Sequence, residues 1–244
     1  MYEASARARV GDVPYFGGLA PAELEFLVTA KDEDGRTLLH TAAANGHLQL
    51  LQLLANAGAG KVANKQDDEG WAPLHSAASA GYEAIVAALL SLGATADAVN
   101  SSGQTALHYA VRPPAPRDAL QGPASKGHTG IVRLLLSAGS KVDPRDGTGS
   151  TPLHRAAATG RLEAARVLVE EGRARIDAHD KAGATPLLVA VACQQANAAV
   201  YLASRGASLA AANKNGETPL ALAGALAPAL QQAAGGGGGA DMEM

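Results

Sequence analysis

Aromatic residues are scarce in this chain, at 3% of 244 residues, although 47% of the residues are hydrophobic. This composition excludes a globule around a large aromatic core and favours a core of alanine and leucine. Because Cys193 is the single cysteine, an intramolecular disulfide framework and a cysteine zinc site are also excluded. A formal net charge of -3 gives no basic footprint for nucleic acid.

Long hydrophobic runs are absent as well. No apolar stretch approaches the roughly 20 residues of a membrane span, and the N-terminal segment lacks the apolar centre of a signal peptide. Arg7 and Arg9 hint at organelle targeting, but the segment is short and contains Glu3. We therefore expect a soluble protein of the cytoplasm and nucleus.

A tetrapeptide related to Thr-Pro-Leu-His returns six times along the chain, each time two residues after a glycine. The intervals between these glycines are 35, 33, 46, 34 and 33 residues, for Gly35, Gly70, Gly103, Gly149, Gly183 and Gly216. A period near 33 with this motif resembles the ankyrin signature of one β-turn and two antiparallel helices. We predict an all-α solenoid of about seven helix-turn-helix repeats with β-turn tips, of which five are complete and two are caps.

Each part of the repeat has a physical role. The Asp/Asn-x-x-Gly segment supplies the positive φ of a tight turn. Threonine then caps the first helix, which proline opens, and alanines keep that helix slim. A second, leucine-rich helix follows. We expect its last residue to be followed by a left-handed glycine, at Gly58, Gly93, Gly139, Gly172 and Gly206. Because no repeat can bury its apolar faces alone, all must stack.

The ends and one interval depart from this pattern. We interpret residues 1–30 as a degenerate N-terminal capping repeat with residues 21–28 as its second helix, residues 31–234 as the repeats, and residues 235–244 as a flexible Gly-rich tail. The interval of 46 residues contains a Pro-rich insertion at 111–123. Removing it joins Ala110 to Ala124 in repeat register, so it interrupts a first helix. It is a passive loop, a gene-model artefact or a docking loop.

Nothing in the motifs predicts an active site. Motif histidines of successive repeats are separated by about 10 Å, far beyond the roughly 2 Å reach of a shared zinc. We expect them to bond the backbone of neighbouring turns; they are His40, His75, His108 and His154. No nucleophile and base are fixed by local spacing, and no phosphate-binding loop occurs. We predict no enzyme, no metal and no cofactor, and a small buried role for Cys193.

Function is then a question of the surface formed by the turn tips and the first helices, which lines one concave face. Its side chains are chemically uneven: Asp34, Arg36, Asp68, Trp71, Tyr109, Lys126 and Arg155. Trp71 is either a lid on its own turn or an interface anchor. The charged residues are either plain solvated charges or contacts. Both signs occur, which favours a partner with mixed charges.

Several stretches of the sequence resemble one particular family of ankyrin-repeat proteins. Residues 67–81 read Asp-Asp-Glu-Gly-Trp-Ala-Pro-Leu-His-Ser-Ala-Ala-Ser-Ala-Gly, and residues 100–110, once joined to 124–126, include His-Tyr-Ala followed by Ala-Ser-Lys. With residues 154–158 and 213–220, they resemble the gankyrin family, ankyrin-repeat assembly chaperones of the proteasome regulatory particle. The resemblance spans residues 31–224 and includes the number of repeats.

The resemblance implies a partner. Members of this family bind the C-terminal helical domain of one ATPase subunit of the proteasome base on the concave face, and so delay its docking on the core particle. It also implies that Asp34, Arg36, Asp68, Trp71 and Lys126 face this partner, and we add Tyr109 and Arg155. We expect a monomer when free, and neither a nucleic acid nor a membrane as partner.

Two departures qualify this expectation. The insertion directly precedes the stretch of Lys126, and residues 189–193 read Val-Ala-Val-Ala-Cys. Animal members carry a Leu-x-Cys-x-Glu motif there, which is associated with retinoblastoma-protein binding, so that activity is not transferred. The competing hypothesis is a general adaptor for a ligase, kinase or transcription factor, because ankyrin arrays serve many partners.

Overall fold

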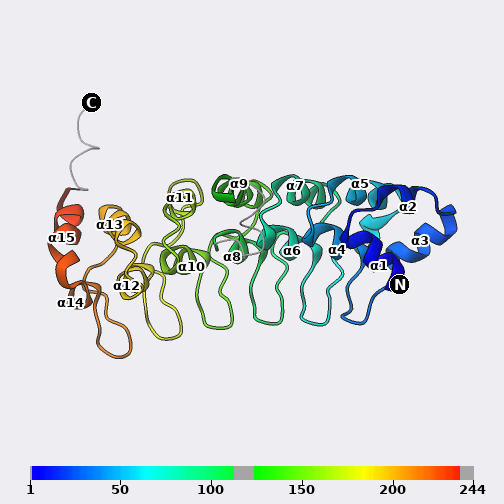
Figure 1. Cartoon of the computed structure of the whole chain (residues 1–244). Helices are drawn as coiled ribbons and strands as arrows, with labels where there is room; N and C mark the ends of the chain where they lie inside the picture. Colours follow the sequence, from blue (N-terminus) through cyan, green and yellow to red (C-terminus); the bar gives the residue numbers. More distant parts are fainter. Residues whose placement is uncertain (1, 113–123, 237–244) are drawn as a thin grey trace. The chain divides into compact units, whose positions relative to one another are not determined.

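The structure is a computed structural model that describes residues 2–112 and 124–236, apart from the side chains of residues 124–127. In this part of the chain the regular elements are all helical (Figure 1). They form two compact units. Of the described residues, unit 1 comprises 2–110 and 124–140, and unit 2 comprises 111–112 and 141–236.

Unit 1 contains three helix pairs that follow the motif. The pairs are α4 (Leu38–Ala44) with α5 (Leu48–Asn56), α6 (Pro73–Ala80) with α7 (Glu83–Ser91), and α8 (Ala106–Ala110) with α9 (Ala124–Ser137). First helices pack on first helices, α4 on α6 and α6 on α8, and second helices on second helices (Figure 1). The fully buried side chains between them are mainly leucines, such as Leu39, Leu51, Leu74, Leu89 and Leu107.

Three helices precede the first motif. They are α1 (Tyr2–Arg9), α2 (Val13–Gly17) and α3 (Pro21–Thr29). The predicted helix at 21–28 is present as α3, but its assignment as the second helix of the cap is wrong, because α1 packs on α4 and α2 packs on α5. The small, buried Ala4 and Ala8 let α1 lie close to α4, and the buried ring of Phe16 fixes α2.

Unit 2 contains a further three pairs. The first is α10 (Pro152–Ala158) with α11 (Leu162–Arg166), which continues as the π-helical turn η2 (Val167–Glu171). The second is α12 (Pro186–Ala192) with α13 (Ala196–Ser204). The last consists of α14 (Pro219–Leu222), the 3₁₀ turn η3 (Gly224–Leu226) and α15 (Ala227–Gly236). Gly235 and Gly236 of the expected tail thus close α15, and residues 237–244 lie outside the described residues.

Six turn tips open the repeats, each a four-residue turn that begins with Asp or Asn. The Oδ1 atom of this residue accepts two backbone N–H groups, from the residues two and four positions later, at 2.8–3.1 Å. Neighbouring tips of unit 1 are joined through their backbones, with Asp68 N–H donating to Asp34 O at 3.0 Å and Ser101 N–H to Glu69 O at 3.1 Å. Side chains of successive tips therefore lie in one row.

Irregular turns absorb the unequal intervals. The 35-residue interval contains an extra 3₁₀ turn, η1 (Ala59–Val62), after α5. The 34-residue interval contains η2. The left-handed glycine predicted after each second helix is confirmed at Gly58, Gly93, Gly139 and Gly206, with φ of 84–93°. It is wrong at Gly172, whose φ is -82°. The extra residue of the π turn moves the left-handed position to Arg173, with φ of 57°.

The interrupted repeat also differs from the prediction. Residues 113–123 of the predicted insertion lie outside the described residues, and α8 ends at Ala110 after five residues. Residues 124–127 were expected to complete this first helix, but they form the start of α9. Thirteen residues separate them from Ala110, so they can extend the second helix, where their carbonyls gain intrahelical hydrogen bonds.

Candidate protein-interaction site

Motif histidines join each first helix to the next turn in unit 1. The Nδ1 atom of His40 accepts the N–H of Thr37 at 3.1 Å, and its Nε2 lies 2.9 Å from the carbonyl oxygen of Trp71. Because a carbonyl only accepts, Nε2 carries the proton. His75 repeats the contact with the carbonyl of Gln104, at 3.1 Å. Burial lowers the pKa of both histidines. Their predicted role at neighbouring turn backbone is confirmed.

This backbone bond places Trp71 beside the first helices. Its half-buried ring lies 4.5 Å from the ring of Tyr109, with the planes tilted by 47°, and 6.1 Å from the ring of His75. His75 meets Tyr109 edge-on at 6.1 Å. Tyr109 is buried, at 6% exposure. Trp71 therefore packs on the following repeat as well as on its own. Neither of the two roles expected from the sequence, a lid on its own turn or an interface anchor, includes this contact.

The tips beside this aromatic cluster carry charge. Asp34 and Asp68 are exposed and lie on neighbouring tips. Arg36 is engaged within the protein, because its Nε lies 3.3 Å from Oδ2 of Asp67, whose side chain is 5% exposed. The structure thus gathers Asp34, Arg36 and Asp68 with Trp71 and Tyr109 in unit 1, and it leaves the two exposed carboxylates facing solvent. The side chain of Lys126 lies outside the described residues.

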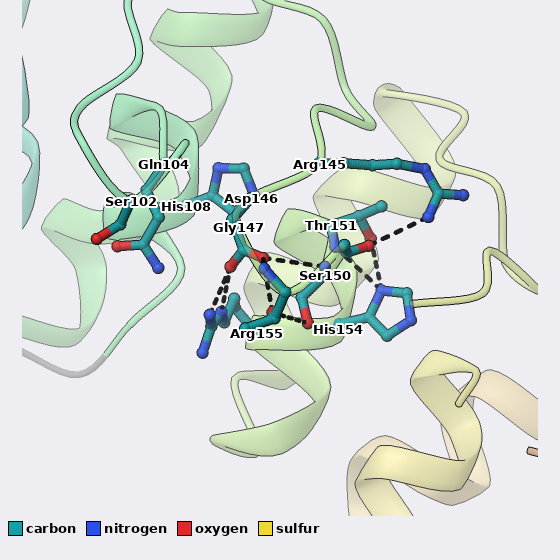
Figure 2. Close-up of polar contacts among 12 residues, drawn as sticks. Ser102, Gln104, His108, Arg145, Asp146, Gly147, Ser150, Thr151, His154 and Arg155 are labelled. Atoms are coloured by element: carbon teal, nitrogen blue, oxygen red, sulfur yellow. Dashed lines mark hydrogen bonds and ion pairs between the residues drawn. The ribbon is translucent and has the colours of Figure 1, made fainter. Parts of the chain in front are cut away.

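Arg155 belongs to unit 2 and has an intramolecular role there (Figure 2). Its Nε donates to Oδ2 of Asp146 at 3.1 Å, and the Asp146 side chain is 1% exposed. Burial alone would raise the pKa of Asp146, but hydrogen bonds from Thr148 and Arg155 outweigh it and hold the pKa below its ordinary value. The guanidinium is therefore largely committed to its own turn, with 34% of the side chain exposed.

A second set of polar side chains was not predicted. An Asn or Asp that stands three residues before the first residue of a turn tip forms a hydrogen bond with the loop of the next repeat. Asn64 Nδ2 donates to Gly93 O at 2.8 Å, and in unit 2 Asp143 accepts the N–H of Arg175 at 3.1 Å and Asp177 that of Ser208 at 3.0 Å. The recurring Asx-x-x-Asx spacing carries this signal in the sequence.

The described residues contain no cluster of three metal-ligating side chains. Within the same ranges, no helix is long and apolar enough to cross a membrane. Cys193, predicted to be buried, is exposed. It caps α12 beside the last repeat, where α14 has only four residues and cannot cover it.

Comparisons with known proteins agree with this architecture. The sequence model of the family described as "Ankyrin repeats (3 copies)" matches residues 39–115 and 120–213, and that of "Ankyrin repeats (many copies)" matches residues 22–55. The crystal structure of the human ASB11 ankyrin repeat domain superposes with a TM-score of 0.75 at 25% identity, over 94% of this chain and 96% of that chain. No curated protein matches the chain.

Proposed function

This chain belongs to the ankyrin-repeat family, whose fold serves as a scaffold for protein interactions. We propose that it is an assembly chaperone of the proteasome regulatory particle. In this proposal it holds the C-terminal domain of one base ATPase subunit on the face formed by the tips and first helices. It acts as a non-catalytic monomer in the cytoplasm and nucleus.

The observation that carries the proposal is the aromatic cluster of Trp71 and Tyr109 beside the exposed Asp34 and Asp68. These residues occur in the stretches that resemble the gankyrin family. A partly exposed tryptophan on an ordered surface is a preferred anchor of protein interfaces, and surrounding charges set the orientation of the partner. Lys126 remains part of the proposed interface through the resemblance.

Binding experiments with the isolated C-terminal domain of each base ATPase test the proposal. We expect one domain to bind, measured by calorimetry, and the full chain to capture that subunit from cell extract. Binding to none of the domains, with ligase or kinase components as the main captured proteins, would support the general adaptor instead.

Substitution of the anchor is the most direct test of the site. Trp71→Ala should weaken binding by about 2 kcal/mol. Because Trp71 also packs on Tyr109, circular dichroism and melting must establish that the variant is folded at the assay temperature. An unchanged affinity in a folded variant would remove Trp71 from the interface.

The exposed charges should act mainly on association. Asp68→Lys should slow association with the ATPase domain and make the rate less dependent on salt, because long-range attraction steers the encounter. Arg36→Glu should also reduce stability, since it places a second carboxylate against Asp67. Stopped-flow rates that are indifferent to ionic strength would contradict this electrostatic contribution.

A further inference from the structure

Trp71, the only tryptophan of the chain, rests on a side chain that a third residue holds in place. The hydroxyl oxygen of Tyr109 accepts a hydrogen bond from Nδ2 of Asn100 at 2.8 Å. Asn100 is 7% exposed, and its Oδ1 accepts the N–H groups of Ser102 and Gln104 at 3.0 and 2.9 Å. A continuous series of contacts thus leads from the turn backbone through Asn100 and Tyr109 to the indole.

The polar atom of the Trp71 indole is Nε1, which carries one hydrogen. Among the described residues, Nε1 of Trp71 donates no hydrogen bond, while the backbone N–H and C=O of the same residue are bonded to Asp67 and His40. The Nε1 atom is also not among the buried unpaired atoms. A surface indole with a fixed ring and an open N–H offers an apolar face together with one directed donor.

We propose that Asn100 is a positioning residue of the interaction site in unit 1. Through Tyr109 it holds Trp71 in one orientation, in which the indole N–H donates to a carbonyl or carboxylate oxygen of the partner protein. This inference rests on the proposed protein-binding function and adds the chemistry of the partner atom. A ring that is ordered before association spares the complex the entropy cost of ordering it.

The corresponding positions in unit 2 show that the fold itself does not require an aromatic residue here. Asp146 and Arg155 have the same spacing of nine residues as Asn100 and Tyr109 and form an ion pair. In both pairs the helix side chain is chemically complementary to the turn side chain: the Tyr109 hydroxyl accepts from the Asn100 amide, and the Arg155 guanidinium donates to the Asp146 carboxylate. The pair is not a requirement of the repeat, because Val189 stands nine residues after Asp180 and Leu222 nine residues after Asn213. Tyr109 occurs in the repeat whose preceding tip carries Trp71.

The free protein provides the first test, because fluorescence excited selectively at tryptophan reports on Trp71 alone. Tyr109→Phe keeps the ring and removes the hydroxyl, so acrylamide should quench the indole more strongly than in the unchanged chain. Asn100→Asp keeps the turn acceptor and can accept a hydrogen bond from the tyrosine hydroxyl, so quenching should stay the same. Thr151→Ala, which removes a hydroxyl that contacts His154 in unit 2, controls for a general loss of stability.

Unchanged quenching in Tyr109→Phe, or an equal increase in Thr151→Ala, would overturn the positioning role. This result does not depend on the identity of the partner. If no ATPase domain binds although the quenching follows the expected pattern, the proposed function fails and the positioning role stands for another protein partner.

The second test uses the ATPase domain that binds. Tyr109→Phe should increase its dissociation rate about fivefold with little change in association, as expected for one lost hydrogen bond. Trp71→Phe keeps an aromatic ring without the N–H and should increase the dissociation rate by a similar factor. Dissociation as slow as that of the unchanged chain in Trp71→Phe would overturn the donor role of the indole.

Discussion

At the scale of single residues, the hydrogen-bond pattern at the start of each first helix depends on the fourth motif residue. Where it is histidine, Nδ1 takes both the N–H and the hydroxyl of the motif threonine, as His108 does with Thr105 at 3.1 and 3.0 Å. Where it is Leu188, the hydroxyl of Thr185 accepts the leucine N–H at 3.2 Å. Threonine is useful in both cases, but through different bonds.

Ala72 is the exception among these positions and allows a stabilising substitution. Because alanine has no hydroxyl, Nδ1 of His75 accepts only the backbone N–H of Ala72, at 3.0 Å. Ala72→Thr should add the missing hydroxyl contact and raise the free energy of unfolding by about 1 kcal/mol. Thr37, Thr105 and Thr151 make this contact while at most 1% exposed, so three other repeats accommodate a buried threonine at this position.

Urea unfolding at neutral pH measures the effect of Ala72→Thr. The matched control is Thr105→Ala, which removes the same contact from the next repeat and should lower the free energy of unfolding by a similar amount. A less stable Ala72→Thr variant would mean that steric crowding at this site outweighs the hydrogen bond.

At the scale of elements, η2 is a local insertion that the fold tolerates. Ala174 N–H donates to Leu168 O at 2.8 Å across six residues, whereas Ala94 N–H reaches Leu89 O at 3.0 Å across five. The extra residue widens the turn and leaves Arg173, exposed and at positive φ, in the position that glycine takes elsewhere. A side chain with a Cβ costs energy there.

Deleting Arg173 should therefore stabilise unit 2. The deletion restores the five-residue connection and brings Gly172 into the left-handed position. We expect a gain of about 1 kcal/mol, measured by thermal and urea unfolding. The control Arg173→Gly relieves the backbone but keeps the π turn, so it should gain less. A lower unfolding midpoint for the deletion would indicate that the π turn supports packing.

The predicted insertion permits a similar test. Deleting residues 111–123 brings Ala124 into the place of the buried Val111 and gives α8 the residues that complete a normal first helix. The protein should fold and be at least as stable, because a shorter connection costs less closure entropy. The ATPase domain should bind at least as tightly, since Lys126 returns to a first helix.

Two outcomes would favour a docking or supporting role for these residues. One is a deletion variant that melts at a lower temperature. The other is a folded variant that no longer captures its partner. Replacing residues 113–123 with a Gly-Ser linker of equal length separates the two effects, because it keeps the connection and removes the sequence.

At the scale of the whole molecule, buried histidines in both units connect stability to pH. Desolvation lowers the pKa of His40, His75 and His154 from the ordinary 6.5. Well above pH 6.5 these groups are neutral in both the folded and the unfolded state. As the pH falls below 6.5, the unfolded chain binds protons that the folded chain does not, so the free energy of unfolding decreases until the lowered folded pKa values are reached.

Urea titrations at intervals between pH 7.5 and pH 5 measure this dependence. Each histidine contributes a slope of up to about 1.4 kcal/mol per pH unit. His154→Gln should be less stable at neutral pH but should show a shallower slope, because one proton-linked group is gone. A free energy of unfolding that stays constant over this range would contradict the assignment of buried neutral histidines.

The sequence by itself determined the repeats, their helices and the histidine contacts, because the Asx-x-x-Gly turn, the Thr-Pro opening and the leucine spacing act within a few residues. It also singled out Trp71, Tyr109 and the charged tips as candidates. Only the tertiary structure decided that Trp71 rests on Tyr109, that Asp146 engages Arg155, and that α2 serves as the second helix of the cap. These arrangements depend on contacts between repeats, where packing and burial select among conformations that the local sequence permits equally.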